Sequence, residues 1–270
     1  KAKGSIAVNG MIEDGAILRA GANLVVAQGI VGETTKVVSG GNVEARFVQN
    51  ATVMAKGDVT VGSYVYNAIV RAGGKLVVVP GTGERAGSIV GGEAMAAGGV
   101  EAAILGSPTT DRTVVGVGAD PDSSVKMQRA RKTQDLYDTQ IARFLRTLGV
   151  AEPNAALLKE AIARAQPAHR KQLIDAAKKL NELIPLRQAS ITEQEELKVA
   201  TEEAISKARV RASNCAHAEV VVCFGDELSR ITEEIAAPLF HVTEDGIRFR
   251  PGGGGGDSSD DGGDSSDEGG

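Results

Sequence analysis

Five segments within the first hundred residues repeat one another, and this repeat constrains the fold more than any other feature of the chain. The copies align without gaps, and their starts lie 19, 16, 17 and 19 residues apart. They are 16–26 (AILRAGANLVV), 35–45 (TKVVSGGNVEA), 51–61 (ATVMAKGDVTV), 68–78 (AIVRAGGKLVV) and 87–97 (GSIVGGEAMAA). A repeat of this length is typical of solenoids, in which each unit packs only against its neighbours.

Every second position of the repeat forms a column of similar residues, as stacked strands require, because alternate side chains share a face. Two columns are apolar and a third, between them, is small in four copies of five, which suits a tight corner. The columns are Leu18, Val37, Val53, Val70 and Ile89; Leu24, Val43, Val59, Leu76 and Met95; and, at the corner, Ala22, Gly41, Gly57, Gly74 and Glu93. Each coil therefore has two short strands and a looser third side, on which Asn50 and Asn67 are expected at turns.

The spacing of the copies predicts a mainly β fold, a right-handed parallel β-helix. Coils of 16–19 residues are too long for the left-handed type, which has six residues on each side. Only 3% of the residues are aromatic and 34 are Gly, so the core must be built from small aliphatic side chains. We expect Val53 and Val70 to be buried and Thr52 to point outward.

From residue 121 the apolar period changes to that of a coiled coil, and we expect an arm of helices there. The seam runs at steps of three and four through Met127, Ala130, Gln134, Tyr137, Ile141, Phe144 and Leu148. Gly149 ends the first helix, Pro153 lies in the first turn of the second, and Pro167 starts the third. Pro185 predicts a break near 185–190, where Ser190 begins a capping box. The outgoing and returning lengths are each about 60 Å, which predicts an inserted antiparallel coiled-coil hairpin.

Strand composition returns after the arm, at 209–212 and 219–224, and Gly225 is expected to form a corner. A last pair of short strands, 239–242 and 247–250, indicates a hairpin. The Gly/Ser/Asp segment that follows cannot bury apolar surface and is expected to be disordered. The predicted organisation is a β-helix at 1–120, a coiled-coil arm at 121–208, strands completing the β-helix at 209–250, and a tail at 251–270.

Charge and composition argue against several classes of partner. The net charge is -5, but residues 251–270 contain six acidic residues and no basic one, so the rest of the chain is nearly neutral. This favours neither nucleic acid nor an anionic membrane as a partner, and no apolar run approaches the ~18 residues of a membrane span. With only two Cys, a disulfide framework is not expected, which favours a cytoplasmic location.

Motifs with known chemistry are few. Residues 81–86 (GTGERA) match a dinucleotide-binding pattern, but a strand follows where a helix is required, so we interpret them as an inter-coil loop. The three histidines, His169, His217 and His241, are scattered along the sequence. Cys215 and Cys223 form no CxxC pair and are interpreted as core thiols. We therefore expect no catalytic, cofactor-binding or metal-binding residues, and no cofactor.

Many β-helix proteins are carbohydrate-active enzymes with carboxylates on an outer face, and this alternative is disfavoured here. The outward positions of the first strand contain no carboxylate: Ile17, Arg19, Lys36, Val38, Thr52, Met54, Ile69, Arg71, Ser88 and Val90. The second strand offers Glu44 and Asp58, but in different columns. A pair of acids of the glycosidase kind is not indicated, so we expect no enzyme activity.

Three segments, in this order and followed by the arm, resemble the flagellar assembly protein A (FapA) family over roughly residues 1–250. They are VNGMIEDGAILRAGANLVV at 8–26, FVQNATVMAKGDV at 47–59 and SIVGGEAMAAGGVEAAILGS at 88–107. The resemblance implies a bacterial protein that acts in the assembly or placement of polar flagella, with no agreed catalytic residues. It also implies protein partners, among them a sugar phosphotransferase system component or flagellar pole proteins.

The leading hypothesis is therefore a non-enzymatic protein-interaction scaffold for flagellar assembly, located at the flagellated pole. The arm also allows a homo-oligomer to form. The first alternative is a self-polymerising, bactofilin-like cytoskeletal β-helix; such proteins lack a long arm, which residues 122–208 provide here. The second is the carbohydrate-active enzyme, which the outer-face columns disfavour.

Overall fold

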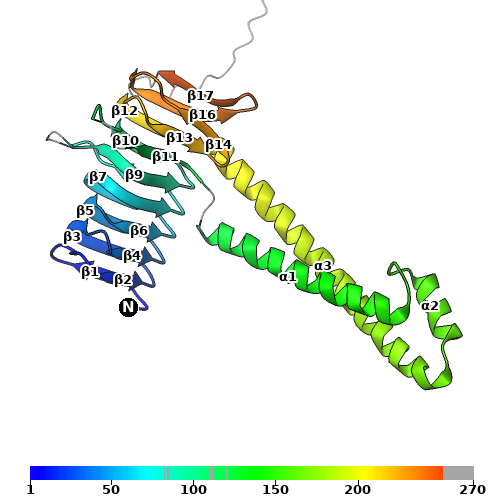
Figure 1. Ribbon diagram of the computed structural model, residues 1–270. Coiled ribbons are helices and arrows are strands. Elements are labelled where there is room, and N and C mark those ends of the chain that lie inside the picture. Colours follow the sequence, from blue (N-terminus) through cyan, green and yellow to red (C-terminus); the bar gives the residue numbers. More distant parts are fainter. Residues whose placement is uncertain (82, 84, 110–111, 119–120, 252–270) are drawn as a thin grey trace, which may run out of the picture.

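The computed structural model describes residues 1–81, 83, 85–109, 112–118 and 121–251. Strands stack into a column of coils, and a long helical arm projects from the upper coils (Figure 1). Each coil has three sides, which we call the first, second and third in chain order. The predicted tail, apart from Pro251, lies outside the described residues.

The strands of the first and second sides form parallel ladders along the column. The first side consists of β2 (Ile17–Ala20), β4 (Lys36–Ser39), β6 (Thr52–Ala55), the end of β7 (Val59–Ala72), the end of β9 (Ser88–Ala96), β11 (Thr113–Val117) and β13 (Val221–Phe224). The second consists of β1 (Ile6–Val8), β3 (Leu24–Val31), β5 (Val43–Gln49), the start of β7, β8 (Leu76–Val78), β10 (Val100–Leu105) and β12 (Val210–Ala216). Later residues of β3, β5, β7, β10 and β12, with the start of β9, form the third side.

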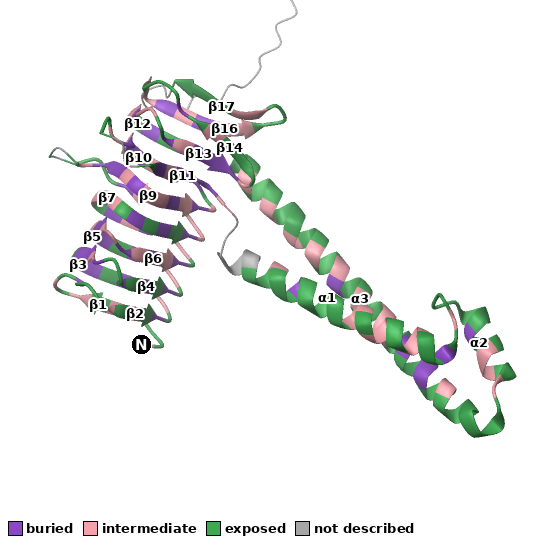
Figure 2. Cartoon of the chain, in the orientation of Figure 1, coloured by how far each residue is buried: buried purple, intermediate pink, exposed green. Residues whose placement is uncertain are grey.

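The register of the first four repeat copies is the predicted one. Val53 pairs with Val37 below it and with Val70 above it, and all three side chains have 0% exposure. Thr52 lies on the outer surface and is half-buried. The two apolar columns of these copies therefore form the interior, and Figure 2 shows buried and exposed residues alternating along the strands.

The fifth repeat copy differs from the prediction. Its first strand, which begins at Ser88, lies on the third side of the coil and not on the first. Ile89 pairs with Val65 and Leu105 on the third side, whereas Val70 pairs with Ala94. The cause is the segment 79–87, which inserts between the second and third sides and delays the next first-side strand. Ser88, expected to point outward, is consequently buried at 4% exposure.

Side-chain oxygens form a ladder along the corner between the first and second sides. Asn23, Asn42 and Asp58 each accept a hydrogen bond through Oδ1 from the backbone N–H one coil higher, at 3.0, 3.0 and 2.8 Å. A Cβ atom on Gly41, Gly57 or Gly74 would lie 2.0–2.2 Å from the same oxygens. The small-residue column is therefore explained by the space that these side chains occupy.

This ladder predicts a non-additive pair of substitutions. Asn42→Ala should lower the unfolding free energy by about 1 kcal/mol, because the Asp58 N–H loses its acceptor. Gly57→Ala should have a similar effect, because its Cβ displaces the same Asn42 oxygen. In the double variant the losses should not add, since the interaction can be lost only once. Urea unfolding of the four proteins measures the coupling, and full additivity would contradict the explanation.

The turns before two first-side strands have the predicted asparagines in a left-handed conformation. Asn50 and Asn67 have φ of 53° and 43°, a region that Asn tolerates better than most residues. The Asn67 amide also donates to Asn50 Oδ1 at 3.1 Å. These residues end the third side of two successive coils.

The arm contains α1 (Pro121–Leu148), α2 (Ala155–Arg164) and α3 (Pro167–Lys207). The predicted break near 185–190 is wrong, because α3 continues through Pro185. Pro185 is exposed, so water can hydrate the carbonyl that loses its helical partner. Ser190 is buried and does not cap a helix. Pro153 lies just outside α2, whose N-cap is Asn154, with Oδ1 accepting from the Ala156 N–H.

The arm replaces one corner of the solenoid. In each of the five preceding coils, three residues connect the first side to the second, as 40–42 do between Ser39 and Val43. Val117 and Val210 occupy the equivalent flanking positions, because Gly116 pairs with Met95 and Val210 with Val100. Residues 118–209 therefore stand in place of three, and the coil resumes after them.

Antiparallel strands end the column above the arm. They are β14 (Glu227–Arg230), β15 (Ile235–Ala236), β16 (Pro238–Thr243) and β17 (Gly246–Pro251). The expected hairpin of β16 and β17 is present, but Gly225 forms the turn between β13 and β14, which sequence analysis missed. Because β15 and β16 pair with β12, they cover its backbone edge, which would otherwise be open for pairing.

Candidate protein-interaction surfaces

The arm is held together by polar contacts as well as by apolar packing between α1 and α3. Ser190 Oγ donates to the Ala130 carbonyl at 3.0 Å, and Gln194 Nε2 donates to Gln134 Oε1 at 2.7 Å. Arg187 forms an ion pair with Asp138. The polar residue predicted in the seam, Gln134, therefore has a partner on the opposite helix.

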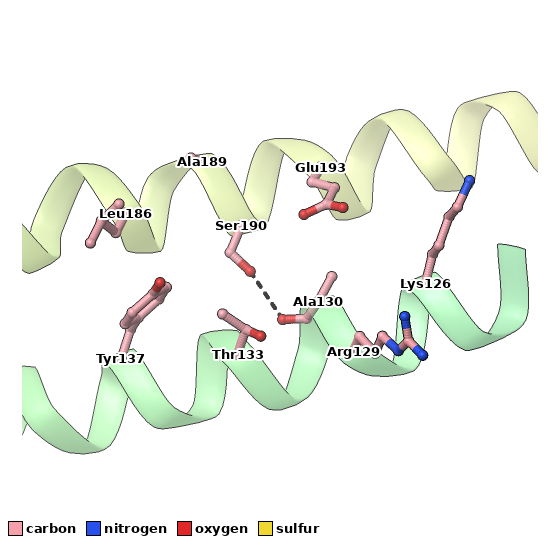
Figure 3. A pocket seen from close by; sticks show the side chains of 9 residues that line it. All are labelled: Lys126, Arg129, Ala130, Thr133, Tyr137, Leu186, Ala189, Ser190 and Glu193. Carbon is pink, nitrogen blue, oxygen red and sulfur yellow. Dashed lines mark hydrogen bonds between the residues drawn. The ribbon is translucent and has the colours of Figure 1, made fainter.

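A groove of about 390 Å³ lies between these two helices (Figure 3). Ser190 points from α3 toward Ala130 at its centre, and Tyr137 and Leu186 line one end. Lys126 and Glu193 line the other end. Leu186 is 49% exposed, so the groove combines apolar surface with charges of both signs.

The distal end of the arm has a small hydrophobic core of its own. Leu148, Leu158, Ala176, Ala177 and Leu180 are buried there, and they come from all three helices. Because α2 contributes Leu158, the turn of the arm is packed rather than open. This core gives the exposed residues around it a defined arrangement.

The exposed surface of this distal end is basic. Residues 139–187 contain nine basic and four acidic residues, whereas 188–208 contain two basic and five acidic ones. The exposed basic side chains, which we call the basic tip, are Arg143, Arg146, Lys159, Arg164, Arg170, Lys171, Lys178 and Lys179. Such an excess of positive charge attracts partners with the opposite charge.

The base of the arm is anchored on the solenoid. Ile205 of α3 packs against the solenoid core, next to the turn at Gly225. A groove of about 610 Å³ at this junction is lined by Met127, Ile205, Phe224 and Val242, among others. The arm is therefore anchored at its base by apolar contacts with the solenoid.

A second candidate surface lies on the third side of the solenoid. Phe47 stacks on Tyr64 with 5.2 Å between ring centroids, because the two residues are paired in register. The Arg85 guanidinium lies 5.0 Å from the Tyr66 ring and 6.0 Å from the Tyr64 ring. A cavity of about 230 Å³ beside them is lined by Tyr66, Arg85 and His217.

The loop that matches a dinucleotide pattern connects β8 and β9. A strand, not a helix, follows it, so the helix N-terminus required for a pyrophosphate is not present in this part of the described chain. Residues 82 and 84 of the pattern lie outside the described residues. Arg85 of this loop instead lies over the two tyrosines.

The outer face of the first side contains a carboxylate that the sequence pattern did not predict there. Glu93 pairs with Ile69 there and forms an ion pair with Arg71 at 2.8 Å. The alignment of the fifth copy had placed Glu93 at a corner, so its position on this face was missed. Asp58, by contrast, belongs to the corner ladder, and Glu44 is exposed on the second side.

The candidate thiols have different surroundings. Cys223 is buried beside Met95, and burial raises its pKa to about 11, but it alternates with the interior residues Val222 and Phe224 and so lies on the outer face of the strand, not in the core as expected. Cys215 is half-buried, and its Sγ lies 3.7 Å from His217 Nε2. His217 Nδ1 lies 2.8 Å from Glu234 Oε2. His169 and His241 lie in α3 and β16, away from this cluster in the chain.

Comparison with known proteins identifies a family for this chain. The family model of the flagellar assembly protein A β-solenoid domain matches residues 1–247. No curated protein and no solved structure matches the chain. Among the described helices, none combines the length and the apolar character needed to cross a membrane.

Proposed function

Because this chain belongs to the flagellar assembly protein A family, we propose that it is a protein-interaction scaffold for flagellar assembly with no enzymatic activity of its own. The observation that carries the proposal is the arm, in which 118–209 replace a three-residue corner and project from the solenoid (Figure 1). An insertion of this kind adds a large surface without altering the stacking of the coils. The solenoid is then a rigid base and the arm the main binding element.

The partner is a protein that presents an acidic surface to the basic tip. Complementary charge accelerates association and selects among partners, and the tip exposes eight basic side chains around a packed core. A sugar phosphotransferase component or a flagellar pole protein is the partner that the family resemblance implies. Such a partner places the scaffold in the cytoplasm at the flagellated pole.

We also propose the hand of the coils and the packing of the arm helices. The coils wind in a right-handed sense, the usual hand of connections between parallel strands. In the arm, α1 and α3 form an antiparallel coiled-coil hairpin, and its exposed faces allow a second copy of the chain to associate.

The alternatives are less well supported by the geometry. A bactofilin-like filament requires coils that stack end to end, whereas β15 and β16 cover the edge of β12. A carbohydrate-active enzyme requires two carboxylates at a suitable separation. On the described first outer face, Glu93 is engaged by Arg71, and it has no second acid paired beside it in register.

Reversing charge at the tip tests this function. In cells that lack the protein, Lys178→Glu/Lys179→Glu should restore flagella poorly, because two attractive contacts become repulsive. Arg19→Glu/Lys36→Glu makes the same charge change at exposed positions of the solenoid and should restore them fully. Flagella per cell are counted by electron microscopy at equal protein levels. Full restoration by the tip variant would contradict the proposed role of the tip.

A further inference from the structure

The geometry points to a divalent transition-metal site, suited to Zn²⁺, formed by Cys215, His217 and Glu234 at the upper end of the solenoid. One ligand atom from each residue lies within 4.8 Å of the other two. The inference is independent of the arm and of the proposed partner.

The strand register explains how residues far apart in sequence meet. Cys215 is opposite Ala236 and Ala216 is opposite Ile235 in the antiparallel pairing of β12 with β15. Continuing this register places His217 opposite Glu234. Cys215 and His217 flank Ala216, which is fully buried, so both side chains lie on the outer surface of the coil.

The donor set and its spacing suit Zn²⁺. Thiolate, imidazole and carboxylate are its usual protein ligands, at about 2.0–2.3 Å from the ion, which places tetrahedral donors about 3.3–3.6 Å apart. Cys215 Sγ lies 3.7 Å from His217 Nε2, close to that separation. Glu234 Oε2 lies 2.8 Å from His217 Nδ1, the ring nitrogen on the other side from Cys215, and the Glu234 side chain is 62% exposed, so the carboxylate has room to move toward an ion held by Cys215 Sγ and His217 Nε2.

The surroundings of the cluster also leave room for water. His217 lines the cavity of about 230 Å³ on the third side, so a fourth coordination position has access to water there.

A metal at this position would link the antiparallel strands to the last coil. Glu234 lies in the connection from β14 to β15, whereas Cys215 and His217 belong to the end of β12. Because an ion that binds only the folded state stabilises it, Zn²⁺ should raise the melting temperature of the intact chain. The metal ligands would then hold the antiparallel strands against the last coil of the solenoid.

Titration of the reduced, metal-free full chain with Co²⁺ tests the site. We expect a thiolate-to-metal charge-transfer band together with the strong visible bands of tetrahedral Co²⁺, both displaced by Zn²⁺. Cys215→Ser should abolish the charge-transfer band, and Glu234→Ala should weaken binding about 10-fold or more. Cys223→Ala and His241→Gln, which change the other thiol and another histidine, should bind as the unaltered chain does.

Two results with the charge-transfer band would overturn the inference. One is the absence of a charge-transfer band in the unaltered chain at millimolar Co²⁺, and the other is a band that persists in Cys215→Ser. Circular dichroism of each variant establishes that it is folded before titration. An unchanged affinity in Glu234→Ala would remove the carboxylate from the ligand set and contradict the three-ligand site.

Discussion

We expect Val53→Asp to abolish the folded solenoid, whereas Thr52→Asp, one residue earlier, should leave it stable. Val53 is fully buried between Val37 and Val70 in the interior column, where a carboxylate would find no partner. The loss should be about 4 kcal/mol or more, which is a large part of the stability of a typical domain. Thr52 is half-buried on the outer surface and is paired with Lys36, so an acid there should change stability by no more than about 0.5 kcal/mol.

Urea unfolding followed by circular dichroism compares these two variants directly. The two side chains are adjacent and receive the same charge, so the comparison isolates the face on which each one lies. Equal losses of stability would show that the strand does not have the register described above.

Removing the arm should leave the solenoid folded. If Gly-Gly-Asn replaces residues 118–209, the connection from Val117 to Val210 becomes equivalent to the natural corner at 40–42. The variant loses the packing of Ile205 on the core, so we expect a decrease in melting temperature of about 5 °C or less. Its far-UV circular dichroism should lose the helical contribution and retain that of the strands.

A matched deletion shows whether the corner explains this result. Joining Val117 directly to Val210 removes the same arm but leaves no residues to turn between the two sides. That protein should fail to fold. A Gly-Gly-Asn variant that also loses its strands would show that the arm is required for the solenoid to form.

The architecture was largely predictable because stacking imposes a period on the sequence. Val37, Val53 and Val70 recur at nearly constant spacing because each contacts the next, and the arm was evident from its different period. The fifth copy was misplaced because Ser88, Ile89 and Val90 alternate like any other strand. They lie on the third side because the segment 79–87 is inserted before them, and an alignment without gaps cannot represent such an insertion.

The contacts between coils were harder to predict, because they join residues that no local pattern relates. The ladder of Asn23, Asn42 and Asp58 could have been suspected, since each follows a small corner residue. The cluster of Cys215, His217 and Glu234 depends on the antiparallel pairing of β15, a two-residue strand that no sequence pattern indicated. The basic tip, by contrast, can be read from charge counts once the turn of the arm is known.

If the arm carries the function that we propose for this protein, the Gly-Gly-Asn variant should lose that function although its solenoid is folded. This variant would be expressed in cells that lack the protein, its level matched to that of the intact chain by immunoblot, and flagella counted on each cell by electron microscopy. We predict that the flagella will be as few or as misplaced as in cells without the protein. Normal number and placement, with a folded variant at normal level, would contradict the claim and assign the function to the solenoid.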